Sequence, residues 1–533
     1  SKYNNTALIL IIAIAIFFRF WQFDSIPSGL YQDEAMNGTD ALKTLETGGF
    51  RTFYTNNNGR EGMIIWLDAL AIKLLGTEPW VLRLFPALAG ILAVLGLFFL
   101  TKELFSIEIA LASSFFMAVS FWAVNFSRIG FRAGLMLPFL IWSFYLLYRG
   151  FKLSKLSILR INNQLSILRI DSRILNFIIA GILFGLGFYT YISYRFAPIV
   201  IVAFFIPYLV KHRIKKLLWG FAIFAIMAFL TALPIGLYFL NNINDFFGRS
   251  GQISIFSAEN PLKATVISIA ATLGMFNVVG DFNWRHNYAS SPQLFLPVGV
   301  LFVVGILICA ERRNLRDKFL FLWFFIFLLP NILSTEGNPH ALRALGALPA
   351  AMIFAGIGLI WLYQKVQNYL NKNLKNQKFT KYQVQILRIK KEVFLLLIVF
   401  LIFIGGFEFN KYFDLWAHNP SVFDAFSGIQ VELANYLNSL PAGLTKYIVW
   451  SNNDKATNNG LPVSAQTVYF LTADKTEINY IKSDEFDKIK LRENGTIIAP
   501  IYFNLDLLHE LQKKYPKSRV EFIGLDIGVI IVP

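Results

Sequence analysis

Blocks of apolar residues alternate with short polar segments along the first 410 residues. About 20 consecutive apolar residues cross the hydrocarbon core of a bilayer as a helix. The pattern therefore predicts about eleven spans, and a polytopic α-helical membrane domain over residues 1–409. The predicted spans cover residues 6–22, 80–101, 107–125, 133–149, 174–191, 196–210, 217–240, 293–310, 319–334, 343–364 and 393–409.

Two of the polar segments are long enough to hold helices of their own. Residues 23–79 contain two helical patterns, 35–47 and 61–75, and the second has an apolar face suited to the membrane surface. Residues 241–292 repeat this design with an apolar helix over 263–279. We expect amphipathic helices in both loops, on the outer side of the membrane.

The composition becomes polar after residue 410, where membrane-length apolar blocks end. Strand-like runs occur over 447–451, 496–502, 519–523 and 527–532, and a helical pattern covers 505–514. This mixture predicts a small α/β domain over residues 410–533. Because it follows the eleventh predicted span, we expect this domain on the extracytoplasmic side.

Composition supports the membrane class, and charge orients the chain. Hydrophobic residues make up 56% of the 533 residues and charged residues only 15%, with a mean hydropathy of +0.53. The formal net charge of +16 arises from Lys and Arg in loops such as 149–173 and 365–391, not from one soluble face, which argues against a nucleic-acid partner. By the positive-inside rule these loops are cytoplasmic. The opposite loops hold the polar clusters that are candidates for function, so we expect these clusters on the extracytoplasmic face of the plasma membrane.

Two adjacent carboxylates, Asp33 and Glu34, follow the first span at the edge of the bilayer. A carboxylate in this position is a functional candidate when it faces a protein cavity. Neighbouring side chains point in different directions, so we expect Asp33 alone to face a substrate; the alternative is a cap for a helix that begins near residue 35. Arg83 is the only charge at the start of span two, and it either extends to the interface or pairs with these carboxylates.

Further arginines lie on the same predicted side. Arg128 and Arg132 are four residues apart, which predicts one shared helix face. Two like charges there favour an anionic phosphate between them, although interfacial anchoring gives the same pattern. Arg195 ends an aromatic cluster over 189–194 that also suits an interfacial belt.

Two outer loops place histidines beside arginines. One contains Asp281, Arg285 and His286, and the other contains His340 and Arg343, whose spacing predicts one helix face. A single histidine is more often a structural hydrogen-bonding group than a catalyst. The histidines lack the spacing of zinc sites, and no Gly-x-x-x-x-Gly-Lys loop occurs, which argues against an ATP-driven pump.

Five motifs, by their order and their predicted side of the membrane, resemble the GT-C superfamily of polyprenyl-phosphate-dependent membrane glycosyltransferases. They are Asp33-Glu34 and the segments 83–88, 126–130, 191–195 and 339–343, and the resemblance covers residues 5–365. The similar branch includes protein O-mannosyltransferases and the bacterial transferases that attach aminoarabinose to lipid A. The tail domain matches no family pattern.

The resemblance implies that Asp33 activates the acceptor, as a base or by holding a divalent metal ion, with inversion at the anomeric carbon. Glu34 supports it, and no second carboxylate motif resembles the metal-binding pairs of oligosaccharyltransferases. Cations would hold the donor phosphate while the bond to the anomeric carbon breaks. The expected donor-phosphate residues are Arg83, Arg128, Arg132, Arg195, His340 and Arg343; the expected acceptor or supporting residues are Arg60, Glu61, Tyr194, Asp281, Arg285 and His286.

We therefore expect a glycosyltransferase that moves a sugar from a polyprenyl-phosphate-linked donor to a hydroxyl or amine of a protein, lipid or glycan. The alternative is a transporter or flippase, in which the same arginines bind phosphate without chemistry. Transporters usually place ionisable residues near the midplane and contain repeated halves. Here the charges gather at one face and no inverted repeat is found, which favours the enzyme. A third alternative is an inactive family member that binds glycolipid.

Overall fold

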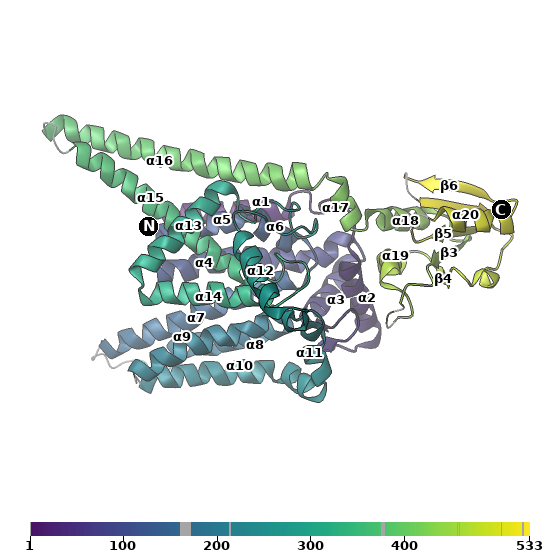
Figure 1. Cartoon of the computed structure of the whole chain (residues 1–533), viewed down its shortest axis with the longest axis horizontal. Coiled ribbons are helices and arrows are strands. Elements are labelled where there is room, and N and C mark those ends of the chain that lie inside the picture. The colour runs from purple at the N-terminus through teal and green to yellow at the C-terminus, as the bar shows by residue number, and fades with distance from the viewer. Residues whose placement is uncertain are drawn as a thin grey trace. The chain divides into compact units, whose positions relative to one another are not determined.

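The computed structural model describes residues 2–159, 172–212, 215–374, 379–455, 457, 459–502, 504–524 and 527–533. The chain forms two compact units that are interleaved in sequence. Unit 1 comprises residues 1–21, 86–128 and 132–415, and unit 2 comprises residues 22–85, 129–131 and 416–533. Figure 1 labels their helices and strands.

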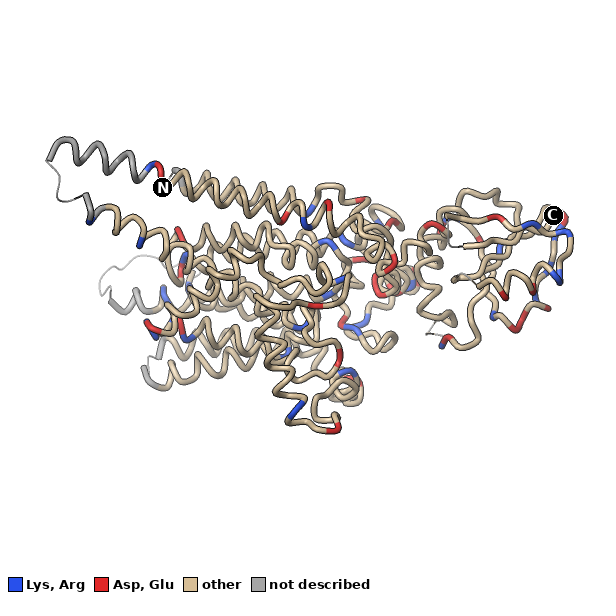
Figure 2. Tube along the Cα trace, turned by 45° about the horizontal axis from the view of Figure 1, so that its top comes forward, with Lys and Arg blue, Asp and Glu red and all other residues tan. Residues whose placement is uncertain are grey.

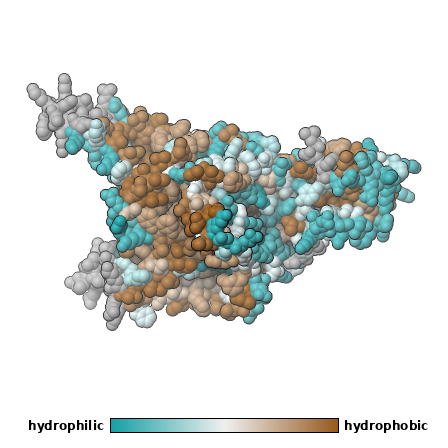
Figure 3. All heavy atoms as spheres, viewed as in Figure 1, coloured by the Kyte–Doolittle hydropathy of each residue, from teal (hydrophilic) through white to brown (hydrophobic). Residues whose placement is uncertain are grey.

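Unit 1 is a bundle of long helices. Figure 2 shows few charged residues along these helices and more at their ends, and Figure 3 shows apolar side chains over much of the bundle surface in view. Its α-helices are α1 (Lys2–Phe20), α4 (Leu84–Leu104), α5 (Ile107–Val119), α6 (Phe121–Arg128), α7 (Ala133–Leu159), α8 (Ser172–Leu186), α9 (Ala197–His212), α10 (Lys215–Asn241), α11 (Ile243–Gln252), α12 (Pro261–Gly274), α13 (Leu296–Arg312), α14 (Leu315–Ile332), α15 (Leu348–Leu374) and α16 (Phe379–Phe409).

Seven of the described helices are long and apolar enough to cross a membrane, or eight if α5 and α6 form one broken span. The apolar helices α1 and α12 are shorter, so this criterion does not confirm the predicted count of eleven. The core of the bundle lies around α15, because its apolar window is 89% buried, whereas that of α16 is 11% buried. Most of the apolar surface of α16 is therefore exposed, as is required of a helix that faces lipid.

The predicted span over 107–125 corresponds to α5 and α6, and the helix is broken at Ser120. The axes of α5 and α6 differ by 55° at this point. The break does not leave the next amide unpaired, since the Glu408 carboxylate accepts a hydrogen bond from Phe121 N at 3.0 Å. A buried amide without a partner costs free energy comparable to a lost hydrogen bond, so Glu408 stabilises the bend.

Unit 2 combines the first long loop with the tail of the chain. In the loop, α2 follows the predicted 35–47 closely and α3 follows 61–75, while the tail adds a five-stranded sheet. Its elements are α2 (Gln32–Thr47), β1 (Phe53–Tyr54), β2 (Arg60–Glu61), α3 (Met63–Leu75), the 3-10 helix η1 (Pro79–Arg83), α17 (Pro420–Ala425), α18 (Gly428–Ser439), β3 (Thr445–Trp450), η7 (Val463–Ala465), α19 (Gln466–Thr472), β4 (Asn479–Lys482), η8 (Phe486–Lys488), β5 (Thr496–Pro500), α20 (Leu505–Lys514), β6 (Arg519–Ile523) and β7 (Ile527–Val532).

The tail sheet has the strand order β4-β3-β5-β7-β6. β3 runs parallel to both β4 and β5, whereas β7 runs antiparallel to β5 and β6. One face forms a core in which Val449, Ile498 and Ile530 pack against Leu508 and Leu511 of α20. A mixed sheet with covering helices is an α/β arrangement, although β4, α18 and α19 were not predicted from the sequence.

Helix α2 packs closely against α19 of the tail. A Cβ atom added at Gly38 would lie 2.5 Å from Cε2 of Phe470, so only glycine fits at this contact. Thr467 Oγ1, one residue after the start of α19, donates a hydrogen bond to the carbonyl of Leu30 at 3.0 Å. These contacts explain why residues 22–85 and the tail form one compact unit.

We expect Gly38→Ala to destabilise unit 2 by about 1–3 kcal/mol, because the added methyl group overpacks the contact with Phe470. The measurement is thermal unfolding of the purified protein in detergent. The double variant Gly38→Ala/Phe470→Leu, which shortens the opposing side chain, should recover part of the loss. An unchanged melting temperature in the single variant would contradict this packing.

Candidate active site

Glu34 is the anchor of the carboxylate pair. It is fully buried and lies in α2, where its carboxylate accepts a hydrogen bond from Tyr31 N at 3.1 Å and so forms part of the helix cap. Gly130 N donates to the same carboxylate at 2.6 Å. Arg83 Nε and Nη2 donate to its two oxygens at 2.9 and 3.2 Å. The predicted pairing of Arg83 with a first-loop carboxylate and the capping role of Glu34 are both confirmed.

All the described hydrogen-bond partners of Arg83 lie in unit 2. Besides Glu34, its guanidinium donates to the carbonyls of Pro27 and Gly29, each at 2.7 Å. It is fully buried and lies 5.8 Å from the ring of Phe426. This geometry supports a role in fixing Glu34 and the preceding loop, and it does not support the predicted contact of Arg83 with a donor phosphate.

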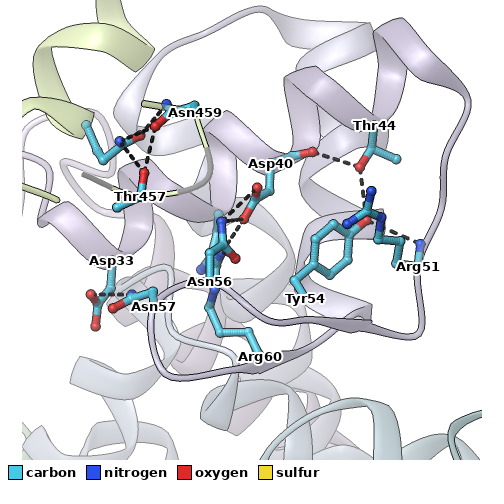
Figure 4. A network of polar contacts seen from close by, with 12 residues as sticks. Asp33, Asp40, Thr44, Arg51, Tyr54, Asn56, Asn57, Arg60, Thr457 and Asn459 are labelled. Carbon is cyan, nitrogen blue, oxygen red and sulfur yellow. Dashed lines mark hydrogen bonds and ion pairs between the residues drawn. The ribbon is translucent and has the colours of Figure 1, made fainter. Parts of the chain in front are cut away.

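Asp33 has a different environment from its neighbour. Its side chain is only partly buried, and its carboxylate accepts a hydrogen bond from Asn57 Nδ2 at 2.8 Å (Figure 4). Asn57 lies in the turn between β1 and β2 with a positive φ of 51°, a conformation that asparagine tolerates better than most residues. The two carboxylates therefore point to different partners, as predicted, and Asp33 keeps access to solvent.

Arg60 organises a second polar network beside this turn (Figure 4). Its guanidinium pairs with Asp40 and donates to Asn37 Oδ1 at 2.6 Å and Asn56 Oδ1 at 2.5 Å. Asn37 in turn donates to the carbonyl of Gly130 at 3.2 Å. Sequence reasoning selected Arg60 but missed Asp40, Asn56 and Asn57; the run of asparagines before Gly59 is a turn signal that marks this segment.

Asp68 is a buried carboxylate that the sequence analysis did not identify. It lies in α3 and is 1% exposed. Neither carboxylate oxygen has a hydrogen-bond partner among the described residues. Burial raises the pKa of Asp68 well above its usual range, the charge of Glu34 adds to this rise, and Arg60 opposes it. We infer that Asp68 is protonated in the folded protein.

Asp281, His286 and His340 form a compact group in unit 1. His286 Nδ1 lies 3.0 Å and His340 Nδ1 3.8 Å from Asp281 Oδ2, and ligand atoms of all three lie within 4.8 Å of one another. Ala341 N also donates to Asp281 Oδ2 at 2.8 Å, which fixes the carboxylate. Two imidazoles and one carboxylate form a donor set that suits zinc and other first-row ions.

This group changes the expectation about metals. The spacing of the histidines did not predict a metal site, because the ligands come from two loops that only the fold brings together. Among the described residues, the group that could hold a metal ion does not include Asp33, the predicted ligand. His340 Nδ1 is buried without a hydrogen-bond partner in the described part of the chain, which leaves it available as a ligand.

His340 and Arg343 do not share a helix face, contrary to the prediction, because they lie in a turn that precedes η5 (Leu345–Ala347). Arg343 pairs with Glu336 at 3.0 Å and donates to Ser334 Oγ at 2.5 Å. Burial lowers the pKa of Arg343, and it lowers the pKa of His340 well below its usual range, with the charges of His286 and Arg343 adding to the effect. His340 is therefore a neutral imidazole and not a cation for a phosphate.

Arg128 and Arg132 also lie on no common helix face. Arg128 is the last residue of α6, and residues 129–132 separate it from the start of α7 at Ala133. Arg128 is fully buried and donates to the carbonyl of Phe18 at 3.1 Å. The prediction was wrong because Arg128 ends one helix and Arg132 precedes the next.

Glu61, in β2 of unit 2, is 2% exposed. The other predicted residues, Arg132, Tyr194, Arg195 and Arg285, lie in unit 1. Arg132 lies 5.6 Å from the ring of Tyr191, and Arg195 lies 4.3 Å from the ring of Phe246, whose carbonyl it contacts at 2.7 Å. Tyr194 is fully buried. The carbonyl of Arg285 accepts a hydrogen bond from Asn125 at 2.7 Å. Arginine over an aromatic face is stabilised by cation–π attraction, so these contacts alone suit anchoring as well as ligand binding.

Comparisons with known proteins address the resemblance. Residues 62–238 match the model of the dolichyl-phosphate-mannose-protein mannosyltransferase family. No curated protein matches the sequence. The matched segment includes Arg83, Arg128, Arg132 and Arg195, and so covers much of the predicted cationic set.

Solved structures share the fold at low sequence identity. The crystal structure of ArnT from Cupriavidus metallidurans bound to undecaprenyl phosphate is 12% identical, with a TM-score of 0.61, and the match covers 99% of this chain and 98% of that one. The archaeal oligosaccharyltransferase AglB from Archaeoglobus fulgidus, in complex with an inhibitory peptide and a dolichol-phosphate, is 15% identical with a TM-score of 0.50, over 93% of this chain and 69% of that one. The family match over residues 62–238 and the fold shared over nearly the whole chain agree with the predicted resemblance.

We expect Arg83→Met to destabilise the protein by about 3–5 kcal/mol, because it leaves Glu34 buried without its cationic partner. Thermal unfolding in detergent measures the loss. The double variant Arg83→Met/Glu34→Gln removes both charges and should recover part of it. Arg51→Met, at an exposed position of the same loop, is the matched control and should have little effect; equal losses in both arginine variants would contradict the assignment.

We expect Asp68→Asn to stabilise the protein near pH 8, by at least about 1 kcal/mol, and to lose this advantage towards pH 4. The folded pKa of Asp68 is raised, so its contribution is favourable at low pH and is lost as the pH rises through the folded pKa. Melting temperatures across this pH range test the prediction against the exposed control Asp24→Asn. A variant less stable than the wild type at pH 8 would show that the carboxylate is ionised and paired.

Proposed function

We propose that the protein transfers a sugar from a polyprenyl-phosphate-linked donor to an acceptor hydroxyl or amine at the extracytoplasmic face of the plasma membrane, with inversion at the anomeric carbon. Asp33 is the general base in this proposal. We also count α1, α13 and α14 as spans, which with α5–α6 as one broken span gives the eleven predicted from the sequence. An odd number of spans and an amino terminus inside place the tail of the chain outside.

The lipid-linked donor is supported by the proteins that share the fold. One was solved with undecaprenyl phosphate and the other with a dolichol-phosphate, both polyprenyl phosphates. The second also holds an inhibitory peptide, which agrees with an acceptor site in the same fold. A phosphate leaving group is already an anion, so the protein needs cationic donors more than an acid to release it.

Asp33 is proposed as the base because its environment differs from that of Glu34. Glu34 is fully buried and accepts hydrogen bonds from Arg83 and from backbone amides, so it is committed to holding the loop. Asp33 has one described polar partner, Asn57, and keeps partial exposure. A general base must reach the proton of the acceptor within about 2.6–3.2 Å. Asp33 meets the condition of access that Glu34 does not.

The cations proposed for the donor phosphate are Arg132, Arg195 and Arg343. Arg132 is only partly buried, and each of the three is oriented by an aromatic ring or a carboxylate. Bidentate arginine contacts to phosphate oxygens fix the position of the leaving group as well as its charge. His340, as a neutral imidazole, would donate a hydrogen bond or ligate a metal.

Asp281, His286 and His340 fit a divalent metal ion by their donor set and by the unpartnered Nδ1 of His340. A bound ion would supply a Lewis-acidic positive charge for phosphate oxygens. The chain's own groups do the remaining work: Asp281 orients the ring of His286 through the 3.0 Å contact, and the amide of Ala341 holds the carboxylate in place.

The test is turnover with a panel of polyprenyl-phosphate sugars by the protein purified in detergent. We expect the wild type to release polyprenyl phosphate when an acceptor is present. Asp33→Asn should lower this rate by about 10²-fold or more, the usual contribution of a general base, with donor binding largely kept.

Asp24→Asn provides the matched control, because it removes an exposed carboxylate from the same loop. Its turnover should equal that of the wild type. Equal turnover by Asp33→Asn and the wild type would overturn the assignment of the base, and no release by the wild type from any donor in the panel would overturn the proposed reaction.

A further inference from the structure

The parallel part of the tail sheet contains a topological switch point. β3 lies between β4 and β5, and the chain leaves the carboxyl ends of β3 and β5 through α19 and α20 respectively. Helix α20 packs on the sheet face that carries Tyr447 and Val449. Lys446 is on the opposite face of β3, where it donates to the carbonyl of Leu440, just after α18, and to Thr476, just after α19. The two connections therefore cover opposite faces.

A crevice forms by necessity where neighbouring parallel strands send their connections to opposite faces. In open α/β sheets, ligands bind in this crevice, outside the carboxyl ends of the strands. In this protein the point lies between Trp450 at the end of β3 and Pro500 at the end of β5. The rule locates a candidate site, and the residues present must decide what it binds.

Polar side chains converge at this edge. Tyr502, two residues past β5, is 45% exposed, and its hydroxyl accepts a hydrogen bond from Gln32 Nε2 at 3.1 Å. Ser464, in η7, donates to Asp454 Oδ2 at 2.8 Å. Burial and the charge of Asp454 raise the pKa of Tyr502, while hydrogen bonds with Gln32 and Ser464 oppose the rise.

The loop that carries Asp454 is held in place by a buried amide. Gln466, the first residue of α19, is fully buried, and its Nε2 donates to Asn459 Oδ1 at 3.0 Å and to Thr457 Oγ1 at 3.3 Å. Thr457 also donates to Asn459 Oδ1 at 2.6 Å, as Figure 4 shows. These bonds connect Thr457 and Asn459, which follow Asp454 in the chain, to the start of α19.

The edge is connected directly to the proposed base. Gln32, which contacts Tyr502, immediately precedes Asp33 in α2. Thr467 of α19 bonds to the carbonyl of Leu30, just before α2, and Gly38 packs on Phe470. A ligand on the edge would therefore lie beside the amino-terminal end of α2, within the same compact unit as Asp33.

We propose that the edge formed by Gln32, Asp454, Ser464 and Tyr502 binds the acceptor, and that this acceptor is a carbohydrate, either a free glycan or the sugar part of a glycolipid. The inference rests on the proposed function, because it names the acceptor class for the base Asp33. Tyr502 supplies the face on which a sugar ring stacks, and the other three groups bind its hydroxyls.

The chemistry of the edge favours a sugar over a peptide. A pyranose presents an apolar face of C–H groups and a rim of hydroxyls that both donate and accept hydrogen bonds. An exposed aromatic ring beside an amide, a hydroxyl and one carboxylate matches both features. One way to recognise an extended peptide is to add it as a strand to an open sheet edge, and the carboxyl ends of β3 and β5 offer no such edge.

The test measures ligand binding to the full chain in lipid nanodiscs by saturation-transfer NMR. The probes are maltotriose, chitotriose and a ten-residue peptide rich in serine and threonine. We expect at least one of the two oligosaccharides to bind and the peptide not to bind. Tyr502→Ala and Asp454→Asn should each weaken oligosaccharide binding at least fivefold.

Phe522→Ala is the matched control, because Phe522 is an exposed aromatic residue on β6, at the far edge of the same sheet. It should bind as the wild type does. If Tyr502→Ala fails to fold, Tyr502→Phe, which keeps the ring and loses the hydroxyl, and Gln32→Ala replace it and should still weaken binding. Unchanged binding in the folded edge variants, binding of the peptide alone, or binding of neither oligosaccharide would overturn the inference.

The outcome is separable from that of the proposed function. Asp33→Asn should retain oligosaccharide binding while losing turnover. If Asp33→Asn keeps full turnover and Tyr502→Ala weakens oligosaccharide binding, the assignment of Asp33 as the base is wrong and the assignment of the acceptor site stands. Loss of turnover in Asp33→Asn with an unchanged acceptor KM in Tyr502→Ala would retain the reaction and reject the site.

Discussion

The buried ion pair between Glu34 and Arg83 is the constraint on which unit 2 depends. Both side chains are fully excluded from solvent, and transfer of two charges out of water is repaid only when all their polar atoms find good partners. The partners are backbone groups of Pro27, Gly29 and Gly130. Three separate stretches of chain are therefore obliged to meet at one point, and the start of α2 is fixed there.

The same constraint separates two residues that are adjacent in sequence. Glu34 must keep its buried pairing with Arg83 for the arrangement to be stable, which removes it from chemistry with a substrate. Asp33 extends from the other side of the first turn of α2 and contacts Asn57 of the β1–β2 turn. A rigid carboxylate beside a partly exposed carboxylate is the kind of preorganisation that a general base requires. In our account, stability and catalysis are thus assigned to neighbouring positions.

Local periodicity predicted much of the fold. α20, β6 and β7 have the predicted bounds, and α2 and α3 begin within three residues of theirs. The shared helix faces failed because α6 ends at Arg128, and because His340 and Arg343 lie in a segment without helix before η5. The short strand β4 and helix α19 have weak patterns of their own, and they are stabilised by the sheet and by α2.

Long-range pairing explains what sequence reasoning missed in the site. The carboxylates, Arg83, Arg60 and the two loop histidines were all identified by residue type. Asn57, Asp40, Asp68 and the grouping of Asp281 with His286 and His340 instead depend on contacts between distant segments. Helix α2 likewise packs against α19, which joins residues 22–85 to the tail. Local sequence patterns do not predict this contact.

The most direct test of this account measures stability and turnover in parallel for Asp33→Asn and Glu34→Gln. We predict opposite effects: Asp33→Asn keeps the melting temperature of the wild type and loses turnover, whereas Glu34→Gln lowers the melting temperature because Arg83 loses its buried partner. A destabilised Asp33→Asn that retains turnover, together with a fully stable Glu34→Gln, would contradict the division of roles.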